Sequence, residues 1–424
     1  MGLIDFRQAI LSHAERDAAA PAVDAPDACL SYGELAARSG VLAQRIIDLS
    51  ATPLGSGIIA ILAPRGAAHI TAMLAVARAG GAFMPVDARL PPVRMLAMLA
   101  HAKPVALLYS DDNAELAGEL ADQFADGLPT LSIAEADGPT GAVAEIEANG
   151  ASYVMFTSGS TGTPKGILGR HKSLNHFIAW QTQTFGLGTA TRTAQLAPVT
   201  FDVSLRDILT PLVNGGTVCV PDEETAGNPR LLAHWLAEKR VSLLHCVPTI
   251  FRLITEALAS AEQAPDFSAL ENILLAGEPL FGRDVRAWRQ ASNSGARLYN
   301  IYGPSETTLA KLFHPISEGD DVDDGMLPIG QALPDTVALV IKGDRLAAVG
   351  EIGEICIRTA FPSLGYVNDV AATRAVFVRN PAGVRDNDII YRTGDLGRSR
   401  PDGTLECLGR LDNQVKIAGN RVEG

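Results

Sequence analysis

Short apolar runs alternate along the chain with longer stretches in which apolar residues recur every three or four positions. Residues 57–64 (GIIAILAP) predict a buried strand, and residues 67–80 (AAHITAMLAVARAG) predict a helix. Further strands are predicted at 83–86, 104–110, 193–199, 241–248 and 271–278, with helices at 204–213 and 229–239. This alternation is typical of α/β folds, in which helices cover both faces of mostly parallel sheets.

The pattern changes after about residue 325. Apolar runs become short and are broken by Gly, Pro and Asp, at residues 338–342, 353–359, 388–398 and 403–410. Such runs predict a small β-rich lobe. We therefore expect two doubly wound α/β lobes over residues 1–325, a small β-barrel-like lobe over 326–410, and a last segment, 411–424, which ends directly after a basic stretch.

Composition narrows the classes of function. The chain has 424 residues with 48 acidic and 35 basic side chains, a net charge of −13. This balance argues against nucleic acid or an anionic membrane as a partner, because both require clustered Lys and Arg. No basic segment followed by an apolar run opens the chain, and no run is long enough to cross a bilayer. The five cysteines are scattered without a CxxC pair, so we expect reduced thiols in a cytoplasmic protein.

The strongest local signal is a loop rich in Gly, Ser and Thr, SYVMFTSGSTGTPKG, at residues 152–166. Glycines let backbone N–H groups approach phosphate oxygens, hydroxyls add donors, and Lys165 adds a positive charge. A Walker A loop is excluded by spacing, because Pro164 stands where its last Gly belongs and Gly166 where its Ser or Thr belongs. A surface turn of small residues is the alternative interpretation.

This loop resembles the phosphate-binding motif of the adenylate-forming superfamily, and the resemblance continues along nearly the whole chain. The motifs occur in the family's order: LSYGEL (30–35), ARAGGAFMPVDARLPPVR (77–94), FDVS (201–204), NIYGPSETT (300–308), GEICIR (353–358), YRTGDL (391–396) and GRLDNQVKIAGNRVE (409–423). The wording of the second and last motifs is closer to adenylation domains of nonribosomal peptide synthetases than to acyl-CoA ligases.

The resemblance implies that ATP, with Mg²⁺, reacts with an amino acid to give an aminoacyl-adenylate and pyrophosphate. Charge neutralisation on the triphosphate and in-line positioning then matter more than a general base. The implied catalytic residues on the phosphates are Thr157, Ser158, Thr161, Lys165 and Thr307, with Glu306 as the Mg²⁺ ligand. The implied ATP-binding residues are Asn300 and Tyr302 at adenine, Asp395 and Arg410 at the ribose, and Gly277.

The resemblance also implies a hinge at Asp412, about which a small C-terminal lobe would swing. The family places a catalytic lysine in that lobe, beyond the last residue of this chain. We therefore expect a domain cut at the hinge, or a piece of an interrupted domain, that binds ligands and adenylates poorly. Implied partners are peptidyl carrier and condensation domains, the phosphopantetheine arm of the carrier, and in some cases a small accessory protein.

Asp202 decides the substrate class, because in this family it pairs with the α-ammonium of an amino acid. An ammonium in a dry pocket is costly without such a partner. The implied lining of the amino-acid pocket comprises Asp202, Val203, Arg206, His245, Leu274, Ala276, Ile301, Leu309 and Ala310. Apart from Ala276 and Arg206, the early part of this set resembles serine-selecting pockets, in which Trp is usual at the position of Arg206.

Arg206 and His245 admit two interpretations each. Arg206 can bind a polar side chain of the substrate bidentately, or it can pair with Asp202 one helical turn away or turn outward. His245 can assist it or can be a core histidine with satisfied hydrogen bonds. We expect a small polar, serine-like amino acid, with an acidic or amide side chain as the next choice. The competing functions are an acyl-CoA ligase of the same superfamily and a binding-only core. Such a core would be non-catalytic and kept for contact with an accessory protein or a neighbouring synthetase domain.

Overall fold

The structure is a computed structural model, which describes the chain except for 1–4, 50–53, 56, 125–126, 135–137, 142, 158–164, 318–323, 384, 386, 412–413, 418–419 and 424. Its residues divide into two compact units. The first comprises 1–191, 195–220 and 363–368, and the second comprises 192–194, 221–362 and 369–424. This division by contacts is separate from the three segments predicted from the sequence, which remain a prediction.

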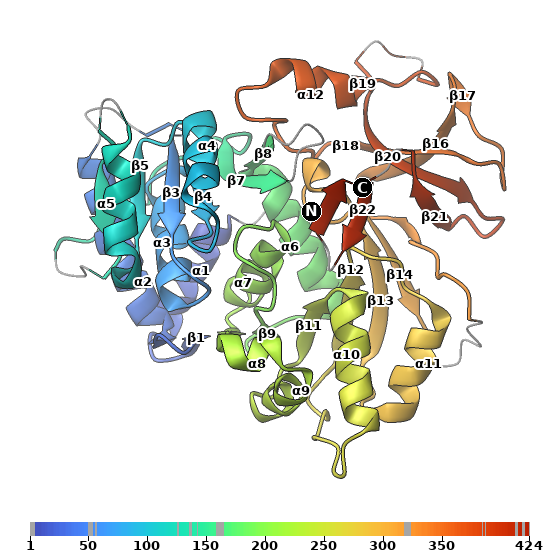
Figure 1. The fold of residues 1–424 in the computed structure, drawn as a ribbon, viewed down its shortest axis with the longest axis horizontal. Coiled ribbons are helices and arrows are strands. Elements are labelled where there is room, and N and C mark those ends of the chain that lie inside the picture. Colours follow the sequence, from blue (N-terminus) through green and yellow to red (C-terminus); the bar gives the residue numbers. More distant parts are fainter. Residues whose placement is uncertain are drawn as a thin grey trace. The chain divides into compact units, whose positions relative to one another are not determined.

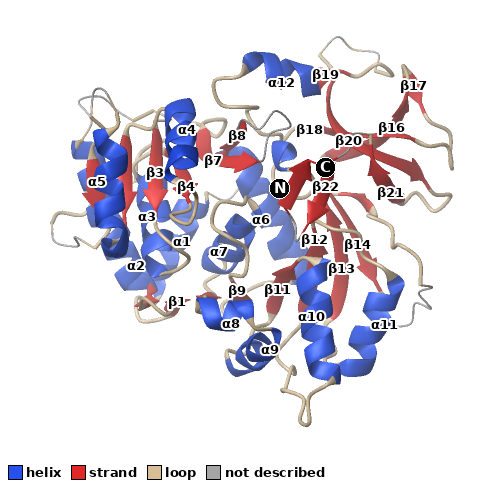
Figure 2. Ribbon diagram, viewed as in Figure 1, coloured by secondary structure: helices blue, strands red, loops and turns tan. Residues whose placement is uncertain are grey.

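The first unit alternates helices and strands (Figures 1 and 2). Its helices are α1 (Phe6–Arg16), α2 (Tyr32–Asp48), α3 (Ala67–Arg78), α4 (Pro92–Ala102), the 3₁₀ turn η1 (Asp111–Asn113), α5 (Ala114–Asp122), α6 (His171–Phe185) and α7 (Val203–Val213). Its strands are β1 (Pro21–Asp24), β2 (Cys29–Ser31), β3 (Ile58–Leu62), β4 (Ala82–Val86), β5 (Ala106–Tyr109), β6 (Thr130–Ser132), β7 (Ala151–Thr157), β8 (Lys165–Arg170) and β10 (Thr217–Cys219).

The main sheet of this unit has the order β6-β5-β3-β4-β7-β8. Its strands run parallel except β8, which is antiparallel to β7. A central parallel strand is covered on both faces, which requires a continuous apolar sequence. Residues 59–62 of β3 are fully buried, as are nearly all residues of α3. The predicted α/β fold class is confirmed here.

The motif LSYGEL has a local structural role at the start of α2. The Ser31 N–H donates to Oε2 of Glu34 at 2.8 Å, and the Glu34 N–H donates to Oγ of Ser31 at 3.2 Å. This reciprocal capping box satisfies two N–H groups that the first helical turn leaves without partners. The motif therefore fixes where the long second helix begins.

The second unit combines an α/β part with a β-rich part. Its helices are α8 (Glu223–Gly227), α9 (Pro229–Glu238), α10 (Pro248–Ala259), α11 (Gly282–Ala291), the 3₁₀ turn η2 (Ser305–Thr307) and α12 (Val370–Val376). Its strands are β9 (Arg192–Ala194), β11 (Leu243–Cys246), β12 (Asn272–Ala276), β13 (Arg297–Tyr302), β14 (Leu312–Ile316), β15 (Gln331–Ala332), β16 (Thr336–Lys342), β17 (Arg345–Leu346), β18 (Gly353–Thr359), β19 (Phe377–Arg379), β20 (Ile389–Ser399), β21 (Leu405–Arg410), β22 (Gln414–Ile417) and β23 (Asn420–Glu423).

In the α/β part, β9, β11, β12 and β13 run parallel in that order, and β14 and β15 continue the sheet antiparallel. Helices α10 and α11 pack side by side beside it (Figure 1). Phe251 of α10 and Trp288 of α11 join them, with ring centres 5.0 Å apart. The strand predicted at 193–199 ends at residue 194 instead. Pro198 lacks the N–H that a ladder needs, so the strand does not extend through the whole predicted run.

The β-rich part is an antiparallel sheet in the order β17-β16-β18-β20-β19, with β21 paired to β20. One core, formed by residues of β13, β14, β16, β18 and β21 among others, lies under it. The predicted small β-rich lobe is confirmed as this curled sheet. In the described part of the chain, no helix is long and apolar enough to cross a membrane.

Candidate functional site

The predicted phosphate loop joins β7 to β8. The two strands form an antiparallel hairpin in which Thr157 faces Lys165, at the two ends of the loop. The Thr157 hydroxyl donates to the backbone oxygen of Lys165 at 3.5 Å. Ser158 and Thr161 lie outside the described residues. Because a strand and not a helix follows Lys165, the strand–loop–helix arrangement of a Walker A loop is excluded by structure as well as by spacing.

The strands β11, β12 and β13 sort the predicted side chains onto two faces. His245 pairs in register with Leu274, and Ala276 pairs with Ile301. Since side chains alternate along a strand, these four residues share one face of the sheet. Asn300 and Tyr302 fall on the opposite face. The predicted substrate-lining residues of these strands are thereby separated from the predicted adenine-binding residues.

Both faces are closed to solvent at these positions. His245, Leu274, Ile301 and Asn300 are all buried. Asn300 donates from Nδ2 to the backbone oxygen of Pro328 at 2.8 Å. This bond fixes the orientation of the amide. Gly277 follows β12 with φ of +93°, a conformation that glycine adopts without strain.

Asp395 is the centre of a buried hydrogen-bond network. The Tyr302 hydroxyl donates to its Oδ2, and Nη1 of Arg410 donates to its Oδ1 at 2.8 Å. Asp395 and Arg410 are cross-strand partners in β20 and β21, so the sheet register itself brings the ion pair together. Burial, followed by the negative charge of Asp395, raises the pKa of Tyr302 well above its usual value. Tyr302 is therefore a permanent donor to this carboxylate.

Thr393 supports the network and was not singled out from the sequence. Its hydroxyl accepts from the Asp395 N–H at 3.0 Å and donates to the Ile355 oxygen at 2.7 Å. Its own backbone oxygen accepts from Arg410 at 3.3 Å. Its place two residues before Asp395, in the motif YRTGDL, is the signal that could have identified it. Thr393 thus anchors both members of the ion pair.

The segment YGPSETT forms a tight turn around η2. Glu306 is 2% exposed and Thr307 is fully buried, with its hydroxyl donating to the Pro304 oxygen at 3.0 Å. Gly303 is required here, since a Cβ at this position would lie 2.5 Å from the Ala310 Cα. The turn continues into Leu309 and Ala310, which are both buried. In the part of the chain that the structure describes, no group of three or more His, Cys, Asp or Glu side chains is placed to hold a metal.

Asp202 and Arg206 lie at the start of α7. Asp202 occupies the N-cap position, is 6% exposed, and precedes Val203, the first helical residue. Arg206 is 4% exposed, so an outward-turned arginine is excluded. Nε of Arg206 lies 3.9 Å from Oδ1 of Asp207, whose other oxygen accepts from the Ala197 N–H at 3.4 Å. A buried guanidinium is thus placed beside a buried carboxylate one residue away. Asp412, the predicted hinge, lies outside the described residues.

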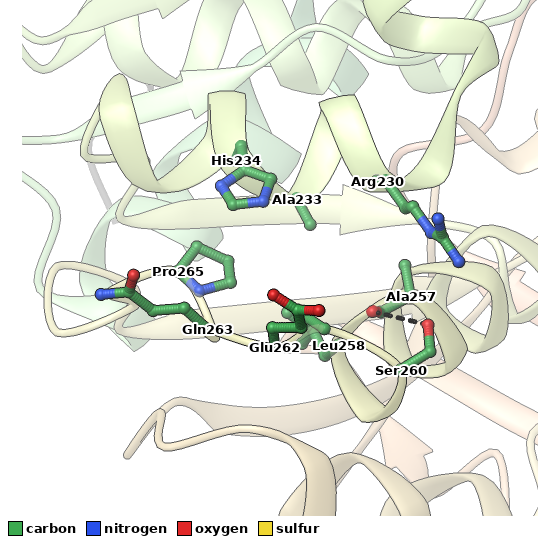
Figure 3. A pocket seen from close by; sticks show the side chains of 10 residues that line it. Arg230, Ala233, His234, Ala257, Leu258, Ser260, Glu262, Gln263 and Pro265 are labelled. Carbon is green, nitrogen blue, oxygen red and sulfur yellow. Dashed lines mark hydrogen bonds between the residues drawn. The ribbon is translucent and has the colours of Figure 1, made fainter.

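A surface cavity of about 470 Å³ lies elsewhere in the second unit, between α9, α10 and the turn after α10 (Figure 3). Arg230, His234 and Glu262 contribute its charged or ionisable side chains. No residue predicted from the sequence lines it. Its charged side chains are exposed, so it lacks the buried polar groups that mark the predicted residues.

Comparison with known proteins places these features in a family. Residues 10–367 match the AMP-binding enzymes. The chain is 33% identical to nonribosomal peptide synthetase 8 of Aspergillus fumigatus, over 99% of this chain but only 5% of that protein. It thus spans a small fraction of the length of this curated relative.

Solved structures agree with this match. The nonribosomal peptide synthetase FmoA3 bound to AMPPNP superposes with a TM-score of 0.87 at 26% identity, covering 97% of this chain and 43% of that one. FmoA3 bound to α-methyl-L-serine-AMP gives a TM-score of 0.85 at 25% identity, covering 97% and 45%. The chain therefore belongs to the family of AMP-binding enzymes and has the architecture of the adenylate-forming domains of nonribosomal peptide synthetases.

Proposed function

We propose that this chain activates an α-amino acid with ATP, forming an aminoacyl-AMP and releasing pyrophosphate. The observation that carries the amino-acid class is Asp202, a buried carboxylate at the first turn of α7. An α-ammonium is costly to hold in a dry pocket unless a carboxylate pairs with it, and Asp202 is suited to that role. A fatty or aryl acid carries no ammonium for Asp202 to bind.

In the reaction, a substrate carboxylate oxygen attacks the α-phosphorus of ATP, a P–O bond forms, and the bond to pyrophosphate breaks. The chain contributes donors and positive charge to the phosphates: the hydroxyls of Thr157, Ser158 and Thr161, the ammonium of Lys165, and Thr307. Fixed donors of this kind stabilise the charge that develops on the phosphates. No protein group needs to accept a proton, because the attacking oxygen is already ionised.

The nucleoside is held by the second unit. Asp395 carries a carboxylate suited to accept from two ribose hydroxyls, and the hydrogen bond from Arg410 orients it. Asn300 and Tyr302 share the sheet face to which we assign adenine, with Gly277 beside them. Tyr302 has two uses in this proposal, since its ring contacts the base while its hydroxyl holds Asp395.

The residues present also fit Mg²⁺. This ion is usually held by one or two carboxylates together with substrate phosphates, rather than by a full protein cage. Glu306 is one such carboxylate, in a buried turn beside Thr307. When bound, the ion would neutralise charge on the triphosphate.

For the side chain of the substrate we propose a small polar, serine-like amino acid. FmoA3, solved in its α-methyl-L-serine-AMP bound form, is among the structural neighbours. The other residues of the proposed lining are Val203, Arg206, His245, Leu274, Ala276, Ile301, Leu309 and Ala310. The buried guanidinium of Arg206 favours a side chain that accepts hydrogen bonds.

We further propose that the product is loaded onto the phosphopantetheine arm of a peptidyl carrier domain in the cytoplasm, next to a condensation domain. Asp412 is the proposed hinge for the change from adenylation to loading. These partners are proposed because the curated relatives are much longer synthetases.

The test measures binding of nonhydrolysable aminoacyl-sulfamoyl adenosines by calorimetry, across all common amino acids, together with amino-acid-dependent ATP–pyrophosphate exchange. Tight binding of one small polar aminoacyl analogue supports the proposal. Preference for a fatty acyl-sulfamoyl adenosine would instead identify an acyl-CoA ligase. Failure to bind any analogue or ATP would leave the non-catalytic core that only contacts other proteins. The variant Arg206→Trp tests whether Arg206 sets the amino-acid preference. It is combined with Asp207→Asn, which removes the charge of the carboxylate beside Arg206.

A further inference from the structure

Residues 363–368 form an additional extended segment on β8, although their neighbours in sequence belong to the second unit. Leu168 donates from its N–H to the Gly365 oxygen at 2.9 Å and accepts at its own oxygen from the Leu364 N–H at 2.7 Å. The Val367 N–H donates to the Gly166 oxygen at 2.7 Å. The segment is therefore bonded to β8 up to the residue after Lys165.

Helix α4 holds the same segment from another side. A ring nitrogen of His101 lies 2.8 Å from the Val367 oxygen, and Asn368 donates from Nδ2 to the His101 oxygen at 2.7 Å. Gly365 takes φ of +95°, which lets the segment bend onto β8 without strain. The backbone on both sides of Tyr366 is thus fixed by hydrogen bonds.

The ammonium of Lys165 lies over the ring of Tyr366, 5.5 Å from the ring centre. This distance is within the range of a cation–π interaction, in which the negative face of the ring attracts the charge. A lysine side chain loses much rotamer freedom when it is held in one place, and a partner that restricts it beforehand lowers that cost. The ring occupies one side of the ammonium and leaves N–H donors for another ligand.

We propose that Tyr366 is a positioning residue for Lys165, holding its ammonium at the end of the phosphate loop for the triphosphate. This inference rests on the proposed function, in which Lys165 binds phosphate. It extends that proposal by adding a residue whose aromatic face, rather than its hydroxyl, sets the affinity for ATP.

The experiment varies the negative electrostatic potential of the ring face while the shape of the ring stays nearly constant. Phenylalanine and its monofluoro, difluoro and trifluoro derivatives are placed at position 366 of the full chain, and the Kd for MgATP is measured by calorimetry. Because each fluorine weakens the negative face, we expect the Kd to rise stepwise, by about 2- to 5-fold from phenylalanine to the trifluoro derivative. The melting temperature without ATP checks that all four proteins are folded.

The same series in a Lys165→Met background is the control, and there the Kd should not depend on fluorination. A flat series with Lys165 present, or a Kd that falls with fluorination, would overturn the positioning role of Tyr366. If Lys165→Met leaves the Kd for MgATP unchanged, Lys165 does not bind the triphosphate and the proposed function is contradicted at this residue. Loss of the positioning role of Tyr366 is thereby distinguished from loss of the phosphate role of Lys165.

Discussion

The hydroxyl of Tyr302 donates a hydrogen bond to Oδ2 of Asp395, 93 residues further along the chain. It joins β13 of the α/β part to β20 of the β-rich part of the second unit. Together with Arg410, it ensures that both oxygens of a buried carboxylate have donors.

Replacing Tyr302 with Phe should destabilise the protein. The ring is kept, but Oδ2 of Asp395 loses a donor while still buried, which costs about 1–3 kcal/mol. Urea denaturation measures the free energy of unfolding, with Tyr109→Phe as the control at a partly buried tyrosine of β5. An unchanged free energy for Tyr302→Phe would mean that water replaces the hydroxyl at no cost.

Asp395→Asn should weaken ATP binding through the ribose alone. Hydrogen bonds to a charged group contribute about 1.5–3 kcal/mol, so the Kd for ATP should rise about 10-fold or more. The Kd for 2′,3′-dideoxyATP should change little, because the hydroxyls are absent. Equal losses for both nucleotides would show that Asp395 supports the fold of the site rather than the ribose.

Asp202→Asn should remove recognition of the α-ammonium. Truncating one partner of a buried charge pair costs about 2–5 kcal/mol, so the Kd for the preferred aminoacyl-sulfamoyl adenosine should rise at least about 30-fold. The desamino acyl analogue provides the comparison and should bind the variant no worse than the parent. If both analogues lose affinity alike, Asp202 supports the fold of the pocket and does not act as a ligand of the ammonium.

Arg206 and Asp207 should be energetically coupled. Removing one partner of a buried ion pair costs about 3–5 kcal/mol, whereas removing both costs much less. We therefore expect Arg206→Met to be more destabilising alone than together with Asp207→Asn. A double-mutant cycle on the free energy of unfolding measures this coupling, and additive losses would contradict it.

Two buried histidines should make stability depend on pH. Burial lowers the pKa of His69 to about 4, and burial followed by the charge of Arg7 lowers the pKa of His171 to about 4. Between that value and the unfolded pKa of about 6.5, the unfolded chain binds more protons than the folded one. The free energy of unfolding should therefore fall as the pH drops through this window, by about 1.4 kcal/mol per pH unit for each histidine.

The variant His171→Phe should reduce the slope of the unfolding free energy against pH by the contribution of one histidine. It keeps a ring beside Phe6, with which His171 stacks at 5.8 Å. His234→Phe, the same change at an exposed position, is the control and should leave the slope as it was. An identical slope in both variants would mean that His171 is protonated in the folded protein.

The sequence predicted much of this fold because its signals are local. The apolar runs of β3 and β12 and the periodicity of α3 and α9 place the bounds of these elements within two residues of those observed. The nonlocal features were not predictable in this way. Nothing in the pattern around Tyr366 shows that it pairs with β8, and the role of Thr393 depends on the register of β20 against β21.

In the candidate site, too, local signals were predictable and nonlocal contacts were not. Motifs supplied the identities of Asp202, Asp395 and Arg410, while the structure supplied their partners. The ion pair of Arg206 with Asp207 illustrates the difference, since spacing on a helix offers Asp202, one turn away, as a partner and does not offer Asp207. Neighbouring residues on a helix point in different directions, so spacing alone does not predict this contact between two buried side chains.

The pairing of residues 363–368 with β8 also constrains how the protein is made. A ribosome that has completed β8 must still synthesise everything up to Asn368 before that strand receives its last hydrogen-bonding neighbour. At about 5–20 residues per second, this interval lasts about 10–40 seconds. During this interval β8 is an edge strand, and the backbone groups of an edge strand can pair with other strands. Completion of the first unit therefore has to wait until residues 221–362, the main part of the second unit, have been synthesised.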